Sequence, residues 1–260
     1  MNIIFLFSGQ SRTSPFSHNL SMSNLVILES YNKYIFTQKF KSMYNYKIYI
    51  TTDDIHLSNT INYFQKDNIG NIHLLNTDAY LKTPIRKSHH INTYLSNYNK
   101  KDWSTYQKYD NSIYQHYKIM DCYNLYKNDA DIHNELNNCD YIVRIRLDVI
   151  FNMDIIDMLS KFTLNPEIEL LTHWDLFAIG KPKIMTCYCN GLNNNYGNYN
   201  YQVKAPDIPS IMVDYNNVDK CRWTYAPERQ LFEMLFEYAN NNNLTINKAI
   251  IPISCCTIVR

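Results

Sequence analysis

The sequence predicts an α/β protein of the Rossmann type, with a mostly parallel central sheet flanked by helices. Short apolar runs at residues 3–7, 47–51 and 71–75 have the length and the β-branched or aromatic content of buried strands. The segments between these runs carry apolar residues at helical spacing. Strands that alternate with helices favour right-handed βαβ crossovers, which place parallel strands in one sheet.

Apolar residues at spacings of three and four mark the helices of this opening. The helix after the first strand is marked by Leu28, Tyr31 and Ile35. The helix after the second strand ends near Gly70 and is marked by Leu57, Ile61 and Phe64. Residues 76–109 are polar and lack periodicity, and a connection of that length is predicted to be a functional flap.

The rest of the chain is predicted to be less regular. Helices at 111–127 and 131–138 lead into a strand at 140–148. Beyond it we expect a helix at 154–161, a strand at 168–172, a further segment at 176–180, helices from 181 and 227, a surface loop at 190–226 and a last strand at 249–259. Because no linker or internal repeat divides the chain, residues 1–260 are predicted to form a single domain.

The composition disfavours several classes of function. With 45% hydrophobic residues, a chain of 260 residues can bury a substantial core. Its 25 basic and 24 acidic residues leave a net charge of +1, which gives no electrostatic footprint for nucleic acid or an anionic membrane. No apolar stretch reaches the roughly 20 residues of a transmembrane helix. The seven cysteines lack the spacing of a zinc motif, which predicts reduced thiols and a cytoplasmic location.

The most informative segment is the predicted strand at 140–148. Arg144, Arg146 and Asp148 alternate with apolar residues, so they face the same way. Three charged side chains on one face of a buried strand are costly without partners or a polar ligand. Asp148 lies near the carboxyl end of the strand, where open α/β sheets bind ligands and where a divalent cation could bridge to a pyrophosphate. The alternative is an internal ion pair between arginine and aspartate that fastens the sheet.

Three segments together resemble a known family. They are Phe-Ser-Gly-Gln-Ser-Arg-Thr at 7–13, Tyr-Ile-Val-Arg-Ile-Arg-Leu-Asp at 141–148 and Trp-Asp-Leu-Phe-Ala-Ile-Gly at 174–180. In this order they resemble the glycosyltransferases of lipopolysaccharide-core, capsule and giant-virus type, which have the GT-A fold. The resemblance implies a nucleotide-sugar-binding half at 1–150 and an acceptor half at 151–260. It also implies a location in the cytoplasm, that of the host if the protein is viral.

This resemblance implies transfer of a hexose-type sugar from a nucleoside diphosphate sugar to a glycan or lipid-linked acceptor. A divalent cation, Mn²⁺ or Mg²⁺, would neutralise the leaving diphosphate, with Asp148 as its ligand. The family's usual Asp-x-Asp is replaced here by Arg146-Leu-Asp148, so one metal ligand is missing from its expected place. A literal Asp-x-Asp begins at Asp129, but its second aspartate, Asp131, is interpreted as the cap of a short helix.

The resemblance also places residues around the donor. The first turn would contribute Gly9, Gln10, Ser11, Arg12 and Thr13. A glycine permits close backbone approach, and a guanidinium offers a forked donor to phosphate. In the same way Arg144 and Arg146 would line the donor side. The alternative for Gly9 and Gln10 is that they only turn the chain.

Further candidates follow other elements. Asp53 and Asp54 follow the second strand, where a carboxylate could hydrogen-bond a ribose or base, although a plain turn is an equal alternative. Gln115, Tyr117 and Lys118 resemble a Gln-x-Tyr-Lys element that would place the lysine near phosphate or acceptor. On spacing alone, Lys118 would be a solvated side chain.

Two carboxylates are candidates for the base that accepts a proton from the acceptor hydroxyl. Asp175 follows Trp174, whose ring could stack on a sugar, and Glu228 lies in the first turn of a predicted helix. The alternatives are a turn aspartate beside a buried tryptophan and a glutamate that favours the positive helix end.

Two other classes compete with transfer. A non-catalytic nucleotide-sugar or glycan-binding module could retain the fold after losing the second metal aspartate. Thiol chemistry through Cys187-x-Cys189 or Cys255-Cys256 is disfavoured, because neither pair has the two-residue spacing of a redox motif.

Overall fold

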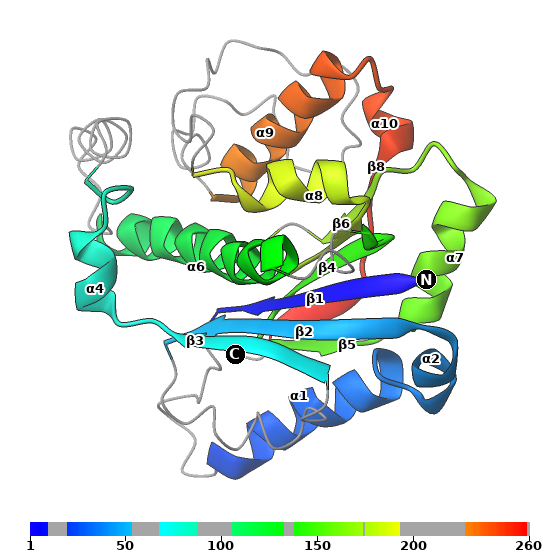
Figure 1. Cartoon of the computed structure of the whole chain (residues 1–260), viewed down its shortest axis with the longest axis horizontal. Coiled ribbons are helices and arrows are strands. Elements are labelled where there is room, and N and C mark those ends of the chain that lie inside the picture. Colours follow the sequence, from blue (N-terminus) through cyan, green and yellow to red (C-terminus); the bar gives the residue numbers. More distant parts are fainter. Residues whose placement is uncertain are drawn as a thin grey trace.

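The computed structural model of the chain describes residues 1–9, 20–53, 68–87, 106–132, 138–173, 175–192 and 227–258. Its centre is a seven-stranded sheet in the order β3-β2-β1-β4-β7-β6-β8 (Figure 1). Its strands are β1 (Asn2–Ser8), β2 (Asn45–Thr52), β3 (Ile69–Leu74), β4 (Tyr141–Arg146), β6 (Leu170–His173), β7 (Phe177–Gly180) and β8 (Ile250–Pro252). All but β7 run in the same direction, which confirms the mostly parallel α/β prediction.

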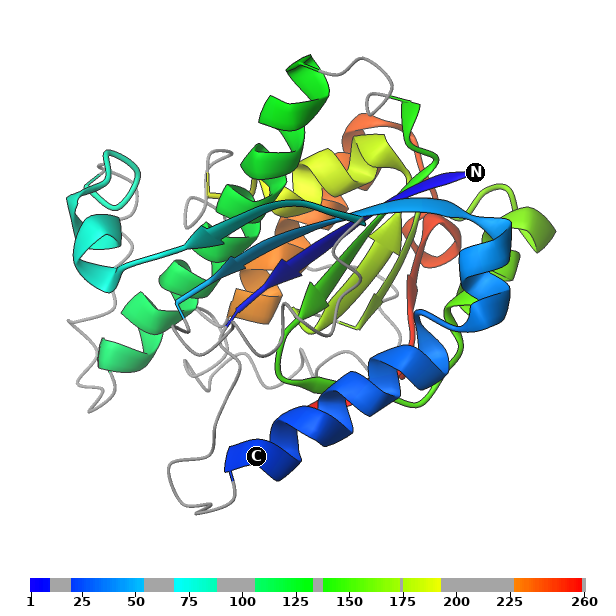
Figure 2. The same ribbon diagram turned by 60° about the horizontal axis from the view of Figure 1, so that its bottom comes forward.

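Helices cover both faces of this sheet. One face carries α1 (Leu20–Tyr34), α2 (Gln38–Met43) and α7 (Ile155–Leu164), and the other carries α6 (Tyr106–Ile132), α8 (Pro182–Cys189) and α9 (Pro227–Asn241). Figure 2 shows α1 and α6 on opposite sides of the strands. Because both faces are covered, β1 is apolar almost throughout, as expected for a buried parallel strand. Two shorter helices, α4 (Thr77–Lys82) and α10 (Ile246–Ala249), complete the described set.

The helix boundaries follow from local capping. The side chain of Thr37 accepts a hydrogen bond from the backbone N–H of Phe40 at the start of α2. Asp154 does the same for Ile156 at the start of α7, and Pro182 occupies the first turn of α8, where no backbone donor is needed. Helices α7 and α8 therefore begin within one residue of positions 154 and 181, where the sequence predicts their starts.

Three predicted elements are corrected. The strand predicted at 140–148 ends at Arg146, and Leu147 and Asp148 form a turn into a separate short strand, β5 (Val149–Phe151). The last strand predicted at 249–259 is two strands, β8 in the main sheet and β9 (Cys256–Ile258), which pairs with β5. The flap predicted at 76–109 contains α4 and the first turn of α6. Most of the second predicted helix, residues 57–67, lies outside the described residues, and its predicted end at Gly70 is inside β3 instead. Residues 88–105 of the predicted flap and most of the loop at 190–226 also lie outside the described residues.

The strand order places a topological switch beside β1. The chain passes from β1 to β2 and β3 on one side and then returns to β4 on the other side of β1. In open α/β sheets, ligands bind outside the carboxyl ends of the strands at such a point. The carboxyl ends of β1 and β4 are Ser8 and Arg146, which face each other in the register of the two strands.

Candidate active site at the carboxyl edge of the sheet

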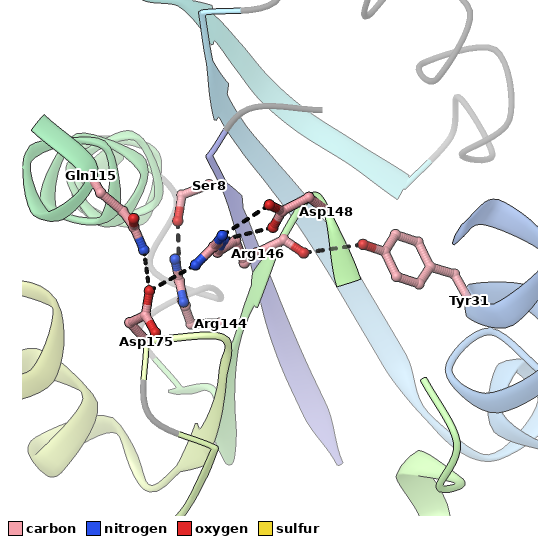
Figure 3. A network of polar contacts seen from close by, with 7 residues as sticks. All are labelled: Ser8, Tyr31, Gln115, Arg144, Arg146, Asp148 and Asp175. Atoms are coloured by element: carbon pink, nitrogen blue, oxygen red, sulfur yellow. Dashed lines mark hydrogen bonds and ion pairs between the residues drawn. The ribbon is translucent and has the colours of Figure 1, made fainter. Parts of the chain in front are cut away.

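Arg146 is the centre of a polar network at this edge (Figure 3). Its Nε and Nη2 atoms donate to the two carboxylate oxygens of Asp148 at 2.6 and 2.9 Å. Its Nη1 donates to Oδ2 of Asp175 at 2.9 Å. Burial alone would lower the pKa of Arg146, but the adjacent carboxylates of Asp148 and Asp175 more than offset it, so the net pKa is raised. This arginine is therefore held in its charged form between two carboxylates.

The backbone around Arg146 fixes the network. The hydroxyl of Tyr31 on α1 donates to the carbonyl of Arg146 at 3.2 Å, from the opposite side of β4 (Figure 3). The N–H of Arg146 donates to the carbonyl of Leu176 at 2.9 Å. Gly9 has a φ of +133°, a backbone angle that residues other than glycine rarely adopt. A Cβ at this position would lie 3.3 Å from Cγ of Arg146. The glycine of the first turn thus permits close approach to this arginine.

Asp175 enters the network from the turn between β6 and β7. Its Oδ2 accepts from Arg146 and from the side-chain amide of Gln115 on α6. Within the described part of the chain, its Oδ1 accepts no hydrogen bond. Asp175 is buried, with 6% of the residue exposed, so Oδ2 is held within the network and Oδ1 has no hydrogen-bond donor among the described residues.

A second ion pair lies beside the first. Nζ of Lys118 on α6 donates to Oδ2 of Asp53 at 2.7 Å and lies 4.2 Å from the centre of the Tyr114 ring. The lysine is 4% exposed, so the prediction from spacing of a solvated side chain is wrong. Burial lowers the pKa of Lys118, the charge of Arg146 lowers it further, and the bond with Asp53 offsets part of this.

Arg144 lies deeper than Arg146. Its side chain is fully buried, and its Nε donates to Oγ of Ser8 at 3.2 Å. Its terminal nitrogens are also buried, and no described residue accepts a hydrogen bond from them. In the described chain no carboxylate forms an ion pair with Arg144, whereas Arg146 pairs with two carboxylates and Lys118 with one. Arg144 therefore adds positive charge beneath these three ion pairs.

Two aspartates on α6 bond to the strands beside it, of which Asp121 was not predicted and Asp129 was considered only as part of an Asp-x-Asp. Asp121 accepts from the hydroxyl of Thr51 at 2.9 Å and lies 2.8 Å from Nδ1 of His73. Asp129 accepts from Lys47 and Tyr49, at 2.8 and 2.6 Å. The spacing of three between Lys118 and Asp121, which puts both on one helix face, was the available signal.

These contacts correct the interpretation of the Asp-x-Asp that begins at Asp129. The predicted short helix at 131–138 does not start here, because α6 continues to Ile132. Asp131 is therefore inside the last turn of a long helix and is no N-terminal cap. Asp129 joins α6 to β2 through its hydrogen bonds with Lys47 and Tyr49.

The burial of Tyr49 and its bond to Asp129 should make the free energy of unfolding fall as the pH rises above about 10. Burial raises the pKa of Tyr49 most, and the hydrogen bond to Asp129 raises it further. Because the folded-state pKa exceeds the unfolded value of about 10, this contribution is complete below pH 10 and is lost as the pH rises through the folded value. Tyr49→Phe should reduce the slope of unfolding free energy against pH by up to about 1.4 kcal/mol per unit. Urea unfolding at several alkaline pH values measures it, and an unchanged slope would contradict the assignment.

Several predicted site residues lie where the structure does not describe them. Gln10, Ser11, Arg12 and Thr13 of the first turn are outside the described residues, as are Asp54 and Trp174. Glu228 is the second residue of α9, and its side chain is likewise outside the description. The structure thus brings together Gly9, Asp53, Lys118, Arg146, Asp148 and Asp175 at one edge, with Arg144 below them.

The described carboxylates do not fit a divalent cation as they are arranged. Asp148 is 1% exposed, and both of its oxygens are hydrogen-bonded to Arg146. A hard cation takes several oxygen ligands, and it would have to displace a guanidinium from this aspartate. In the described part of the chain, no cluster of three carboxylates offers an alternative. As arranged here, Asp148 is a partner of Arg146 and not a metal ligand.

Comparison with known proteins gives matches only at the level of solved structures. No protein-family model matches the sequence, and a search of curated proteins finds no match. In the described chain, no helix is both long and apolar enough to cross a bilayer. The six cysteines of this part are free thiols.

The matching structures cover nearly the whole chain at low similarity. A protein named as a nucleotide-diphospho-sugar transferase from Desulfovibrio desulfuricans has 7% identity and a TM-score of 0.40, covering 97% of this chain and 79% of its own. A cytidylyltransferase from Leptospira borgpetersenii has 14% identity and a TM-score of 0.33, and the match covers 93% of this chain and 94% of that protein. Mouse xyloside xylosyltransferase 1, in its apo form, has 11% identity and a TM-score of 0.33, and the match covers 96% of this chain and 77% of that protein. At values this low, the function has to be inferred from the site itself.

Proposed function

We propose that the protein is a nucleotide-sugar-dependent glycosyltransferase that transfers a hexose-type sugar to a glycan or lipid-linked acceptor. One observation carries the proposal. Arg146, Lys118 and Asp175 converge at the carboxyl ends of β1 and β4, where open α/β sheets bind nucleotides. The resemblance of residues 7–13, 141–148 and 174–180 to GT-A glycosyltransferases supports it, because these segments include the turn and strand that meet there.

The two cations are suited to a diphosphate leaving group. Three of the five N–H donors of Arg146 bond to Asp148 and Asp175, which leaves two for phosphate oxygens, and the ammonium group of Lys118 acts as a compact charge. Arg146 is held at the edge by Asp148, so that aspartate positions the donor-binding arginine. Stabilising the charge that develops on the departing diphosphate lowers the barrier to transfer. Gln10, Ser11, Arg12 and Thr13 would complete the donor side of the same site.

Asp175 is suited to accept the proton of the acceptor hydroxyl. Its Oδ2 is held by Arg146 and Gln115, and its Oδ1 accepts no hydrogen bond in the described chain. A base must lie within hydrogen-bond reach of the proton that it removes. The acceptor oxygen would then attack the anomeric carbon, the bond from that carbon to the diphosphate would break, and the nucleoside diphosphate would leave. Glu228 is the competing candidate for this role.

A second candidate function is a binding module without turnover. The specific observation in its favour is that both oxygens of Asp148 are occupied by Arg146 and that the aspartate is 1% exposed. A fold that has lost its second metal aspartate could keep the donor site and lose catalysis. Such a module would bind a nucleotide sugar and leave it intact.

An assay with the full chain separates the two functions. The protein is incubated with UDP- and GDP-linked sugars, with Mn²⁺ in one series and EDTA in the other, and release of nucleoside diphosphate is measured. We expect release from at least one donor. A donor that raises the unfolding free energy, by about 2.7 kcal/mol at 100 times its Kd, but is never cleaved would select the binding module. Absence of both cleavage and stabilisation by any donor would contradict both functions.

The EDTA series tests the expected Mn²⁺ or Mg²⁺. Turnover that is lost with EDTA and restored by Mn²⁺ would assign a divalent cation to the reaction. Turnover that is unchanged would leave neutralisation of the diphosphate to side chains such as Arg146 and Lys118.

A further inference from the structure

A cluster of thiol and imidazole groups lies at the end of β6. His173 is the last residue of β6, and Cys256 is the first residue of β9. Nδ1 or Nε2 of His173 and the two Sγ atoms of Cys255 and Cys256 all lie within 4.8 Å of one another. Among the described residues, no other group of three potential metal ligands gathers in this way.

The convergence of the two cysteines is unusual for neighbours in sequence. Adjacent side chains of an extended strand point to opposite faces. Cys255 precedes the first residue of β9 and is outside any strand, so the backbone can direct both thiols to the same side. The local backbone is held in place, because Asn152 donates to the carbonyl of Cys255 at 3.0 Å and Cys256 pairs with Phe151.

The thiol of Cys256 and the imidazole of His173 are hydrogen-bonded to each other. Sγ of Cys256 lies 3.5 Å from Nδ1 of His173. These two ligand atoms therefore already face a common position, where a cation would take the place of the shared proton.

The spacing suits a tetrahedral ion. With Zn–S distances of about 2.3 Å and Zn–N distances of about 2.0 Å, neighbouring ligand atoms of a zinc site are separated by roughly 3.5–3.8 Å. The three atoms, all within 4.8 Å of one another, lie close to this spacing. Cys255 and Cys256 are at most 1% exposed, whereas His173 is partly exposed and gives a route from solvent.

We propose that His173, Cys255 and Cys256 form a binding site for Zn²⁺. The set of two sulfurs and one imidazole nitrogen selects zinc over Mg²⁺ or Mn²⁺, which prefer oxygen ligands. Three protein ligands leave one tetrahedral position for water. On binding, the ion replaces the proton of the Cys255 thiol and the proton shared by Cys256 and His173. Both protons are released to solvent, and the two thiolates neutralise the charge of the ion.

Cobalt provides a direct spectroscopic test on the full chain. The protein is reduced, freed of metal with EDTA, dialysed and titrated with Co²⁺. We expect a sulfur-to-cobalt charge-transfer band together with the visible bands of tetrahedral cobalt, and we expect Zn²⁺ to displace both. Cys256→Ser and His173→Gln should weaken Co²⁺ binding by more than the roughly 10–100-fold typical of losing an outer-shell partner. Cys187→Ser, a partly exposed thiol on α8, is the matched control and should leave the titration unchanged.

A second measurement needs no variant and so does not depend on the folding of Cys256→Ser. Wild-type protein is alkylated with and without Zn²⁺, and the modified cysteines are identified by peptide mass spectrometry. Zinc should slow modification of Cys255 and Cys256 relative to Cys187, whereas Mg²⁺ should not. Absence of the cobalt band in the wild type, persistence of that band in Cys256→Ser, or equal alkylation with and without zinc at times when Cys255 and Cys256 are modified in the zinc-free protein would overturn the proposal. None of these readouts depends on sugar transfer.

Discussion

Replacing Asp175 by asparagine should lower the rate of sugar transfer by about 10²–10⁴-fold, the usual contribution of a general base. Asparagine keeps the size of the side chain and one acceptor oxygen, so Arg146 and Gln115 retain a hydrogen-bond partner. We therefore expect kcat to fall with little change in donor affinity. The measurement is the initial rate of nucleoside diphosphate release at saturating donor and acceptor, together with donor binding by calorimetry.

Two variants make this result interpretable. Asp157→Asn makes the same chemical change at an exposed position in the first turn of α7, and it should leave the rate unaltered. Glu228→Gln tests the competing base. If Glu228→Gln abolishes transfer while Asp175→Asn retains it, the base is Glu228, and Asp175 serves only to orient Arg146.

Replacing Arg146 by methionine should lower the free energy of unfolding by about 3–5 kcal/mol, as expected when one partner of a buried ion pair is removed. The variant would leave the carboxylates of Asp148 and Asp175, whose side chains are 2% and 8% exposed, without their cation. The unfolding free energy of Arg146→Lys should lie between those of the wild type and Arg146→Met, because lysine restores the charge without the forked donor that Asp148 binds. Urea unfolding at neutral pH measures all three proteins.

The matched control for this loss is an ion pair near the surface. Lys181 bonds to Glu169 at 2.9 Å, and the two side chains are 35% and 20% exposed. Lys181→Met should cost no more than about 1 kcal/mol. If Arg146→Met costs as little as Lys181→Met, water reaches Asp148, and the buried network described at the edge of the sheet is wrong.

The sequence predicted the scaffold of the fold well because its signals are local. Apolar runs without polar interruption mark β1 and β2, and residues such as Asp154 and Pro182 mark helix starts within a few positions. The end of β4 was misplaced because Val149 and Phe151 continue its apolar alternation. Only the pairing of β5 with β9, which is distant in sequence, shows that the strand stops at Arg146.

The sequence predicted which residues form the site but not which of them form ion pairs and hydrogen bonds with one another. Alternation places Arg146 and Asp148 on one face, and the structure contains the ion pair between them that is the alternative interpretation of this pattern. Nothing in the sequence specified that Asp175 would share Arg146, or that Lys118 would be buried against Asp53. These contacts join segments that come together only when the sheet forms. The thiol cluster escaped detection for the same reason, because its histidine lies far along the chain from its adjacent cysteines.

The pairing of β5 with β9 has a consequence for how the protein matures on the ribosome. The turn that carries Asp148 lies between β4 and β5, and Val149 pairs with Ile258. At a synthesis rate of about 5–20 residues per second, the partner of Val149 is made roughly 5–20 s after Val149 itself. During translation, a nascent chain could therefore assemble β1, β2 and β4 while this turn is still unsecured, and it would acquire its final shape only once residues 256–258 have left the exit tunnel.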